Sequence, residues 1–571
     1  MDKVTRTDLF AHDMVHDNPG LVKYESKYND SAFLKERGYD GKTFDLYNCA
    51  QYGLLWDNLE KKYGRPKIFA ENSEERNWVL RRREELRKLY QEMADAGLEV
   101  TFMMDIIVLP NTLVERYPEV LNADGKIDIM NPMTAEIFEE MFEEMFQVFP
   151  QINGIYIRYG ETYTGTKFGL PCHRENNPII GNAEEYHIRL INYLKDIVCN
   201  KHQRDIYYRS WGFGEFQYNR ETYLRVSDQI APHPRFYFCI KHTSGDFHRC
   251  FKFNQSLNCG KHKQIVEVQA AREYEGKGAY PNYIADGVIN GFEEYKWLMP
   301  EEENKSLRDV INVKDSLVCG LWTWSRGGGW DGPYVNGRNG KDGEVILKDG
   351  SELWCDLNAY VLSHWAKDTG KSDRFYAMQY AKDILHLSNA DCHFFYEICI
   401  LSARAVLLGR GTNTGKMPWN VWWTRDQNIN QAAFEENVKK AVECDAEDIL
   451  LWEKRRSVEL WEEIVSLAER ISTGESREYI VTTCQYGYYL YAIYESMYRA
   501  NIYTLIGEAE KAITAKENYN KLWKGWMELK EKNTCCPTLY AKEDEIQRLI
   551  GYEGNKGFDS VMNGVGREEN L

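Results

Sequence analysis

The chain has 571 residues, of which 43% are hydrophobic and 28% charged, so it is long enough for two or three domains with full cores. A formal net charge of −17 argues against nucleic acid as a partner, because binding phosphate backbones needs a basic surface. No apolar leader follows Met1, no run of 18 apolar residues occurs, and none of the 14 cysteines form a C-x-x-C pair. We therefore expect a cytoplasmic protein with reduced, buried thiols and no membrane partner.

The first 330 or so residues alternate short β-rich apolar runs with amphipathic helical stretches, the pattern of βα units and a parallel sheet. A closed (β/α)8 TIM barrel fits this count best. An open doubly wound sheet is the second choice, because no G-x-G-x-x-G turn follows the first run. The eight predicted strands are Leu9–Met14, Thr43–Tyr47, Glu99–Asp105, Gly154–Tyr159, Asp205–Trp211, Arg235–Ile240, Gln264–Ala270 and Leu317–Trp324.

The helices between the strands carry recognisable start and stop signals. Asn72-Ser73-Glu74-Glu75 places a capping residue before a helix that Gly97 ends, and Asn182 with Glu185 repeats the device. Apolar residues recur at helical period between Thr134 and Phe149. These stretches are predicted to form the outer ring of the barrel.

After about residue 350 the β-rich runs stop, and long helical patterns follow up to residue 550. The sequence predicts a barrel domain over residues 1–350 and an all-α domain over 351–571. Segment 327–349 is dense in Gly, Asn and Asp, which indicates a loop at the barrel mouth. The predicted helices are 435–443, 449–471 and 479–497, and the last 20 residues are predicted to be a loosely ordered tail.

Residues that end the strands of such a barrel line a shared site. Glu161 follows the fourth strand beside aromatic residues, where partial desolvation suits a general acid. The alternatives are a solvated loop glutamate or an ion pair with Arg158. Asp246 and Glu273 follow the sixth and seventh strands, each near cations. Glycoside hydrolysis needs one such acid and one such base.

Other candidates, among them Arg158 at the end of the fourth strand, contact substrate rather than act on it. Arg209, at the end of the fifth strand, can hold a substrate carboxylate in bidentate fashion or neutralise Glu161 or Asp246. His12 and Asp13 are interpreted as ligands of sugar hydroxyls; a metal site is disfavoured because they follow a strand. Trp211 is predicted to contact substrate. Three tryptophans that flank the eighth strand are predicted to stack on sugar rings, with core packing as the alternative: Trp322, Trp324 and Trp330.

Two neighbouring strand ends carry a recognisable signature: Ile240-Lys241…Asp246-Phe247, then Gln269 and Arg272-Glu273-Tyr274-Glu275-Gly276. This pair resembles the I-K-x-x-x-x-D-F and Q-I-T-Q-E-Y-x-G-Q segments of the xylan α-glucuronidases, glycoside hydrolase family 67, and family 115 is comparably related. The resemblance covers roughly residues 150–370. It implies a helical domain after the barrel.

The resemblance also implies roles. Glu161 would protonate the glycosidic oxygen, Asp246 and Glu273 would position and deprotonate water to give inversion, and Arg209 and Lys241 would bind a uronate carboxylate. We therefore expect an inverting, exo-acting glycosidase that releases α-linked glucuronate from a small oligosaccharide in xylan degradation, without cofactor or metal. The alternatives are a glycosidase that acts on another sugar or with retention, and a non-catalytic carbohydrate-binding barrel. Aromatic-rich helices over 449–497 also allow a homo-oligomer.

Overall fold

In the computed structural model, the described residues are 4–15, 27–159, 170–174, 179–211, 214–249, 251–272, 275, 278–326, 353–412, 420–421 and 431–532. Of the candidate site residues, Glu161 and Glu273 lie outside the described residues, as does Trp330. So do the loop predicted over 327–349 and the predicted tail.

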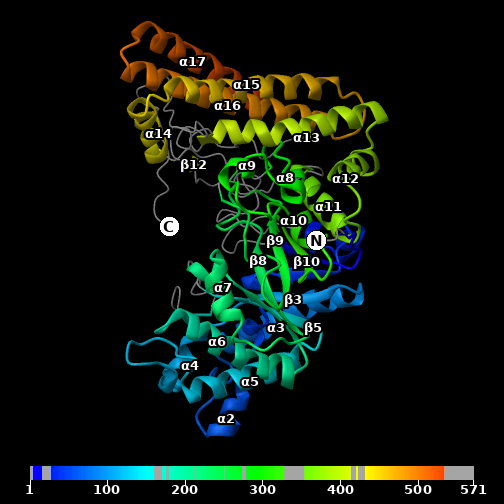
Figure 1. The fold of residues 1–571 in the computed structure, drawn as a ribbon. Helices are drawn as coiled ribbons and strands as arrows, with labels where there is room; N and C mark the ends of the chain where they lie inside the picture. The colour runs from blue at the N-terminus through cyan, green and yellow to red at the C-terminus, as the bar shows by residue number, and fades with distance from the viewer. Residues whose placement is uncertain are drawn as a thin grey trace.

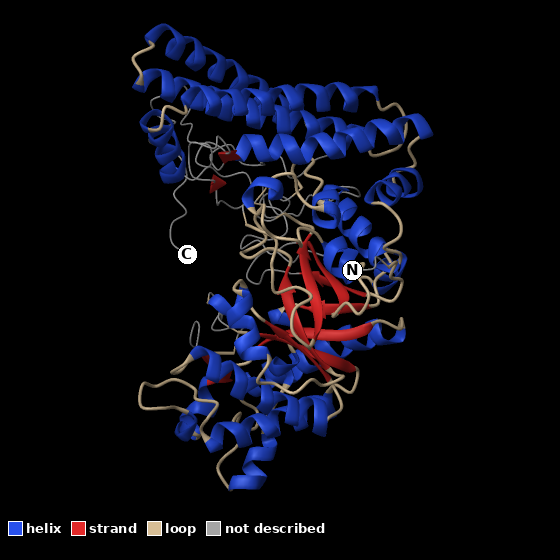
Figure 2. Cartoon of the chain, in the orientation of Figure 1, coloured by secondary structure: helices blue, strands red, loops and turns tan. Residues whose placement is uncertain are grey.

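Eight parallel strands close into a barrel in the order β1-β10-β9-β8-β7-β5-β3-β2 (Figure 2). The predicted (β/α)8 barrel with a following helical region is thus confirmed. The barrel strands are β1 Phe10–Val15, β2 Gly41–Phe44, β3 Glu99–Asp105, β5 Ile152–Arg158, β7 Asp205–Arg209, β8 Phe236–Lys241, β9 Lys263–Gln269 and β10 Val318–Arg326. Two further strand pairs are β4 Val108–Pro110 with β6 Cys172–Arg174, and β11 Gly411–Thr412 with β12 Asn420–Val421.

All eight predicted strands are present, and the second shows how a side chain sets a boundary. The prediction ran from Thr43 to Tyr47, but β2 ends at Phe44. The carboxylate of Asp45 accepts hydrogen bonds from the backbone N–H groups of Tyr47 and Asn48, at 2.8 and 2.9 Å, and so starts a 3-10 turn. A competing local hydrogen bond therefore ends the strand early.

Among the described residues from 31 to 311, ten helices accompany the barrel strands: α1 Ser31–Glu36, α2 Asp57–Tyr63, α3 Glu74–Asp95, α4 Asn111–Arg116, α5 Pro132–Val148, α6 Ala183–Leu194, α7 Arg220–Ser227, α8 Ala285–Asn290, α9 Tyr295–Leu298 and α10 Leu307–Ile311. The caps of two of them follow the sequence signals. Ser73 accepts a hydrogen bond from the N–H of Arg76 at the start of α3, and Asn182 accepts one from Glu185 at the start of α6. Gly97, just after α3, has φ +71°.

The C-terminal part of the described chain is helical: α11 Leu353–Lys367, α12 Asp373–Gln379, α13 Asn389–Arg410, α14 Gln431–Glu443, α15 Glu447–Arg470, α16 Arg477–Leu505 and α17 Ala509–Lys532. Helices α13, α15, α16 and α17 form a layer across the top of the view in Figure 1, each packed on the next. Helix α11 instead packs against β10 and β1, as the last outer helix of the barrel. The domain boundary at residues 350/351 stays a prediction.

Among the described helices, α13 has the length and apolar composition that could cross a membrane. Within its most apolar window 56% of the residues are buried in the structure, and the helix packs against α15.

Inward-facing side chains fill the barrel, because alternate residues of each strand point to its axis. Buried apolar groups pack there from β3, β5, β7, β8, β9 and β10: Met103, Tyr156, Tyr207, Cys239, Ile265 and Trp322. Towards the ends of the strands the inward residues become charged, with Asp105, Arg158, Arg209, Lys241 and Glu267. These five charged side chains therefore lie at the C-terminal end of the barrel.

Candidate active site

A buried carboxylate, Glu267 on β9, organises the centre of this polar layer. It accepts hydrogen bonds from the hydroxyl of Tyr156 on β5 at 2.5 Å and from the indole N–H of Trp324 on β10 at 3.2 Å. The guanidinium of Arg209 on β7 lies 3.2 Å from Oε2 of the same carboxylate. Three strands thus bring partners to one carboxylate on a fourth, and Arg209 also lies 5.0 Å from the ring centre of Trp324. Burial raises the pKa of the Tyr156 phenol well above its usual value, so this hydroxyl stays a donor.

A second ion pair joins two of the predicted site residues, Lys241 at the end of β8 and Asp246 in the loop that follows. The ammonium of Lys241 lies 3.3 Å from the ring centre of Trp211 and 4.4 Å from that of Phe247. A cation held between two aromatic faces and a carboxylate is a well-defined charge. Trp211 therefore packs against the ammonium of Lys241, whereas Trp324 donates its indole N–H to Glu267.

Arg158 is paired with a carboxylate on a neighbouring strand. Its guanidinium donates to both oxygens of Asp105 on β3, at 2.6 and 3.1 Å. Both groups are buried, which makes this a bidentate ion pair in the barrel wall. The structure therefore gives Arg158 a partner that the sequence reasoning had not assigned to it.

Solvent exposure separates the three acids. The side chain of Asp246 is 19% exposed, whereas those of Asp105 and Glu267 are 3% and 0% exposed. A carboxylate that acts on water or on a sugar must be reachable from solvent, and the other two are saturated by buried donors. Among the described acids of this layer, Asp246 is the one placed to meet a substrate.

The structure does not bring His12 and Asp13 to this end of the barrel. His12 pairs in register with Gly41, and its ring nitrogens lie near Thr43 and, at 3.2 Å, the carboxylate of Glu99, the first residue of β3. Its ring stacks on Trp322 at 4.5 Å. This is a core position near the start of the strands, and Trp322 is core as well.

Asp13 follows His12 directly and, by strand alternation, points to the opposite face of β1. It is fully buried there, 2.5 Å from the ammonium of Lys42, and it accepts a hydrogen bond from the hydroxyl of Ser325. The prediction of sugar contacts for His12 and Asp13 took them to end the first strand. In fact β1 continues to Val15, so neither residue is at the end of the strand.

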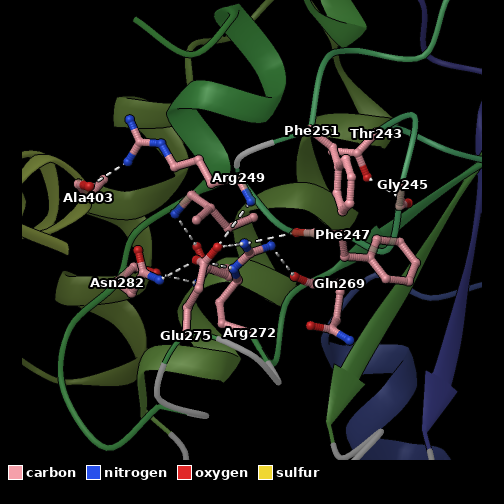
Figure 3. A network of polar contacts seen from close by, with 12 residues as sticks. Thr243, Gly245, Phe247, Arg249, Phe251, Gln269, Arg272, Glu275, Asn282 and Ala403 are labelled. Atoms are coloured by element: carbon pink, nitrogen blue, oxygen red, sulfur yellow. Dashed lines mark hydrogen bonds and ion pairs between the residues drawn. The ribbon is translucent and has the colours of Figure 1, made fainter. Parts of the chain in front are cut away.

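The loops that follow β8 and β9 are joined by the network in Figure 3. Arg272 donates a hydrogen bond to the carbonyl of Phe247 at 3.0 Å and forms an ion pair with the carboxylate of Glu275. The same carboxylate accepts a hydrogen bond from the side chain of Asn282 at 2.8 Å. Phe247 and Arg272 both have left-handed backbones, with φ +54° and +52°. Such conformations cost about 1–3 kcal/mol each in a residue with a side chain and concentrate at functional sites.

These loops carry two of the residues chosen from the sequence signature. Phe247 directly follows Asp246, and Arg272 directly precedes Glu273 in the sequence. Burial alone would raise the pKa of Glu275, but the charge and hydrogen bonds of Arg272 outweigh it and lower the pKa to about 2. Glu275 is therefore an anion bound in place by its neighbours.

Sequence reasoning missed Glu267, Tyr156 and Glu275. The available signal for Glu267 was its place two residues before Gln269 in an apolar strand, which puts an ionisable group on the inward face. Nothing in the sequence identifies its partner Arg209, which lies two strands away across β8. Among the described residues, no group of three or more His, Cys, Asp or Glu side chains is arranged to hold a metal ion.

The barrel with its helical layer is similar in fold to a solved glycoside hydrolase. This structure is a family 138 enzyme that targets pectin rhamnogalacturonan II, with a TM-score of 0.53 and 12% identity over 98% of this chain and 67% of that chain. At this identity the similarity establishes the fold. No family model and no curated protein matches the sequence.

Other similar structures include a family 89 glycoside hydrolase from Clostridium perfringens, with a TM-score of 0.46 and 10% identity over 99% of this chain and 61% of that one. An O-GlcNAc hydrolase from Thermobaculum terrenum gives a TM-score of 0.39 and 10% identity, covering 92% and 90%. The kinship with families 67 and 115 that the sequence signature suggests stays a prediction.

Proposed function

We propose that this protein is a glycoside hydrolase that removes a terminal, α-linked uronic acid, in the first instance glucuronic acid, from a small oligosaccharide. The observation that carries the proposal is the Lys241–Asp246 pair at the C-terminal end of the barrel, held between Trp211 and Phe247. It places an accessible carboxylate beside a cation and aromatic rings at the end of the barrel where such enzymes act.

The preference for a uronic acid follows the sequence signature, which assigns its carboxylate to Arg209 and Lys241. Arg209 on β7 and Lys241 on β8 both face the barrel interior at its C-terminal end. In the structure Arg209 is 3% exposed and paired with Glu267, whereas Lys241 pairs with Asp246, which is 19% exposed, so Lys241 is the better placed of the two to meet a sugar carboxylate. The family 138 structure of similar fold targets pectin rhamnogalacturonan II, and this substrate supports testing pectic uronides as well as glucuronosyl xylooligosaccharides.

In the proposed reaction, Glu161 protonates the glycosidic oxygen, and Asp246 with Glu273 orients and deprotonates water on the opposite face of the sugar. The outcome is inversion. The accessibility of Asp246 supports its part in this scheme. The parts of Glu161 and Glu273 rest on the sequence signature.

The test is an NMR time course on a glucuronosyl xylooligosaccharide, with a galacturonide and a neutral xylooligosaccharide alongside. We expect β-glucuronic acid as the first product. The α-anomer appearing first would replace inversion by retention. Tight binding without hydrolysis of any of these sugars would identify a carbohydrate-binding barrel instead.

Asp246→Asn tests the residue that the structure supports best. It should lower kcat by about 10²–10⁴-fold, the usual contribution of acid–base groups, with a small change in KM. Glu184→Gln is the matched control, since this acid pairs with Arg225 between the outer helices α6 and α7 and has no contact with a barrel strand in that pair. Equal kcat values for both variants would remove Asp246 from the reaction.

A further inference from the structure

We infer that Glu275, through Arg272, is a positioning residue that fixes the loop carrying Asp246. This inference rests on the proposed function for its catalytic consequence. Glu275 is itself almost fully buried, at 2% exposure, so it does not meet a substrate directly. Its carboxylate instead binds residues of the two loops that follow β8 and β9.

The first step is the set of bonds around the carboxylate. Glu275 accepts from the backbone N–H of Arg249 at 3.2 Å and from the side chain of Asn282 at 2.8 Å. Its other partner is Arg272, with a guanidinium nitrogen 2.6 Å from Oε1 and another 3.0 Å from Oε2. Figure 3 shows these groups pointing at Glu275 from different segments. One buried anion thus ties the β8 loop to the β9 loop.

The second step is what Arg272 does with its remaining donors. Nη2 donates to the carbonyl of Phe247 at 3.0 Å, and Nη1 to that of Gln269 at 3.4 Å. Phe247 has a left-handed backbone, with φ +54°, which its neighbours must enforce. The bond from Arg272 holds the carbonyl of that residue, which follows Asp246 directly.

The third step is the inner side of the same loop. The ring of Phe247 packs within the barrel 5.8 Å from Trp324, and 4.4 Å from the ammonium of Lys241. A Cβ on Gly245 would fall within 2.5 Å of the Phe251 ring, so the loop is tightly packed on both sides. Asp246 is therefore followed by a residue, Phe247, whose ring and carbonyl are held by different contacts. The ring packs in the barrel, and the carbonyl is held by Arg272, which is paired with Glu275.

Glu275→Gln keeps the shape of the side chain and removes its charge. We expect kcat on the glucuronosyl xylooligosaccharide to fall by about 100-fold, the effect of a displacement of about 1 Å in a reacting group, with KM changed by less than about threefold. We also expect faster amide hydrogen exchange over residues 244–251. Should this variant fail to fold, Arg272→Lys is expected to act in the same direction, since one ammonium cannot replace all the directed bonds of the guanidinium.

Glu144→Gln is the matched control. Glu144 on α5 is also a buried anion, with Arg83 at 2.6 Å and the backbone N–H groups of Leu55 and Trp56 both at 2.8 Å. Helix α5, which carries it, lies at the opposite end of Figure 1 from the helical layer. We expect Glu144→Gln to lower stability and leave kcat and the exchange of residues 244–251 unchanged.

Two results would overturn the inference: a Glu275→Gln variant with wild-type kcat and exchange, or a Glu144→Gln variant that loses as much kcat. If the wild-type protein hydrolyses no glycoside tested, the proposed function fails on its own. The exchange of residues 244–251 still decides whether Glu275 fixes this loop.

Discussion

The guanidinium of Arg209 and the carboxylate of Glu267 meet at 3.2 Å inside the barrel, although β8 separates the strands that carry them. Both side chains are almost fully buried. Removing one partner of such a pair leaves an uncompensated charge in a low-dielectric interior, which costs far more than removing both.

Glu267→Gln is therefore expected to lower the free energy of unfolding by about 3–5 kcal/mol, as is Arg209→Met. The double variant should cost less than the sum of the two, because it leaves no buried charge. Urea unfolding of the four proteins measures the coupling. Strict additivity would show that the pair does not interact energetically.

Lys241→Met tests the choice of a charged sugar. Loss of a charge-assisted hydrogen bond to a uronate should lower kcat/KM for the uronoside by about 10- to 100-fold. The variant also leaves Asp246 without its described cation, so a neutral substrate measured in parallel reports that second effect. Equal losses on the two substrates would refute a carboxylate contact by Lys241.

Gly41→Ala tests the packing at the opposite end of the barrel. A Cβ at residue 41 would fall 2.7 Å from Cε1 of His12, which is stacked on Trp322 and cannot move freely. Overpacking of this kind should cost about 1–3 kcal/mol. Thermal unfolding should show that the cost largely disappears in a His12→Ala background, where the ring is absent. An equal cost in both backgrounds would argue against this contact.

Stability should decrease as pH falls from 6.5 to about 4, in part through His187. Burial lowers the pKa of this histidine to about 4, and its ring accepts or donates a hydrogen bond with the hydroxyl of Tyr208 at 2.7 Å. In that range the unfolded chain binds a proton on His187 and the folded protein does not, so lowering the pH favours unfolding.

At about 1.4 kcal/mol per pKa unit, the contribution of His187 is at most about 3.5 kcal/mol. His187→Gln should therefore show a shallower loss of stability between pH 6.5 and 4, measured by urea unfolding at several pH values. His393→Gln, on the exposed side of α13, is the control and should follow the wild-type curve. A His187→Gln curve parallel to the wild-type one would contradict the assignment.

The strands could be predicted because each combines apolar β-rich residues with flanking turn or cap signals; β3 matches the predicted Glu99–Asp105 at both ends. The helix start at Ser73 was equally local. Depth within the barrel was not predictable, since it depends on the register between strands far apart in sequence. His12 and Asp13 were thus assigned to the mouth, whereas pairing with Gly41 and Lys42 places them in the wall.

The candidate site was predictable only in part for the same reason. Lys241 and Asp246 are five residues apart, so their pairing is compatible with one strand end and its loop. The Arg209–Glu267 and Arg158–Asp105 pairs each cross between strands, and sequence spacing does not specify them. Alternation identifies which residues face inward; it does not identify which of them meet.

The carbonyl of Ala403 on α13 accepts a hydrogen bond from Arg249, and the hydroxyl of Ser402 accepts one from the backbone N–H of Tyr283 at 3.1 Å. These hydrogen bonds connect the helical layer to the loops that follow β8 and β9. A variant that contained the barrel alone, or the barrel with the helices of another enzyme, would lose these hydrogen bonds. Swaps should instead carry α11 and α13 along with the barrel as one block.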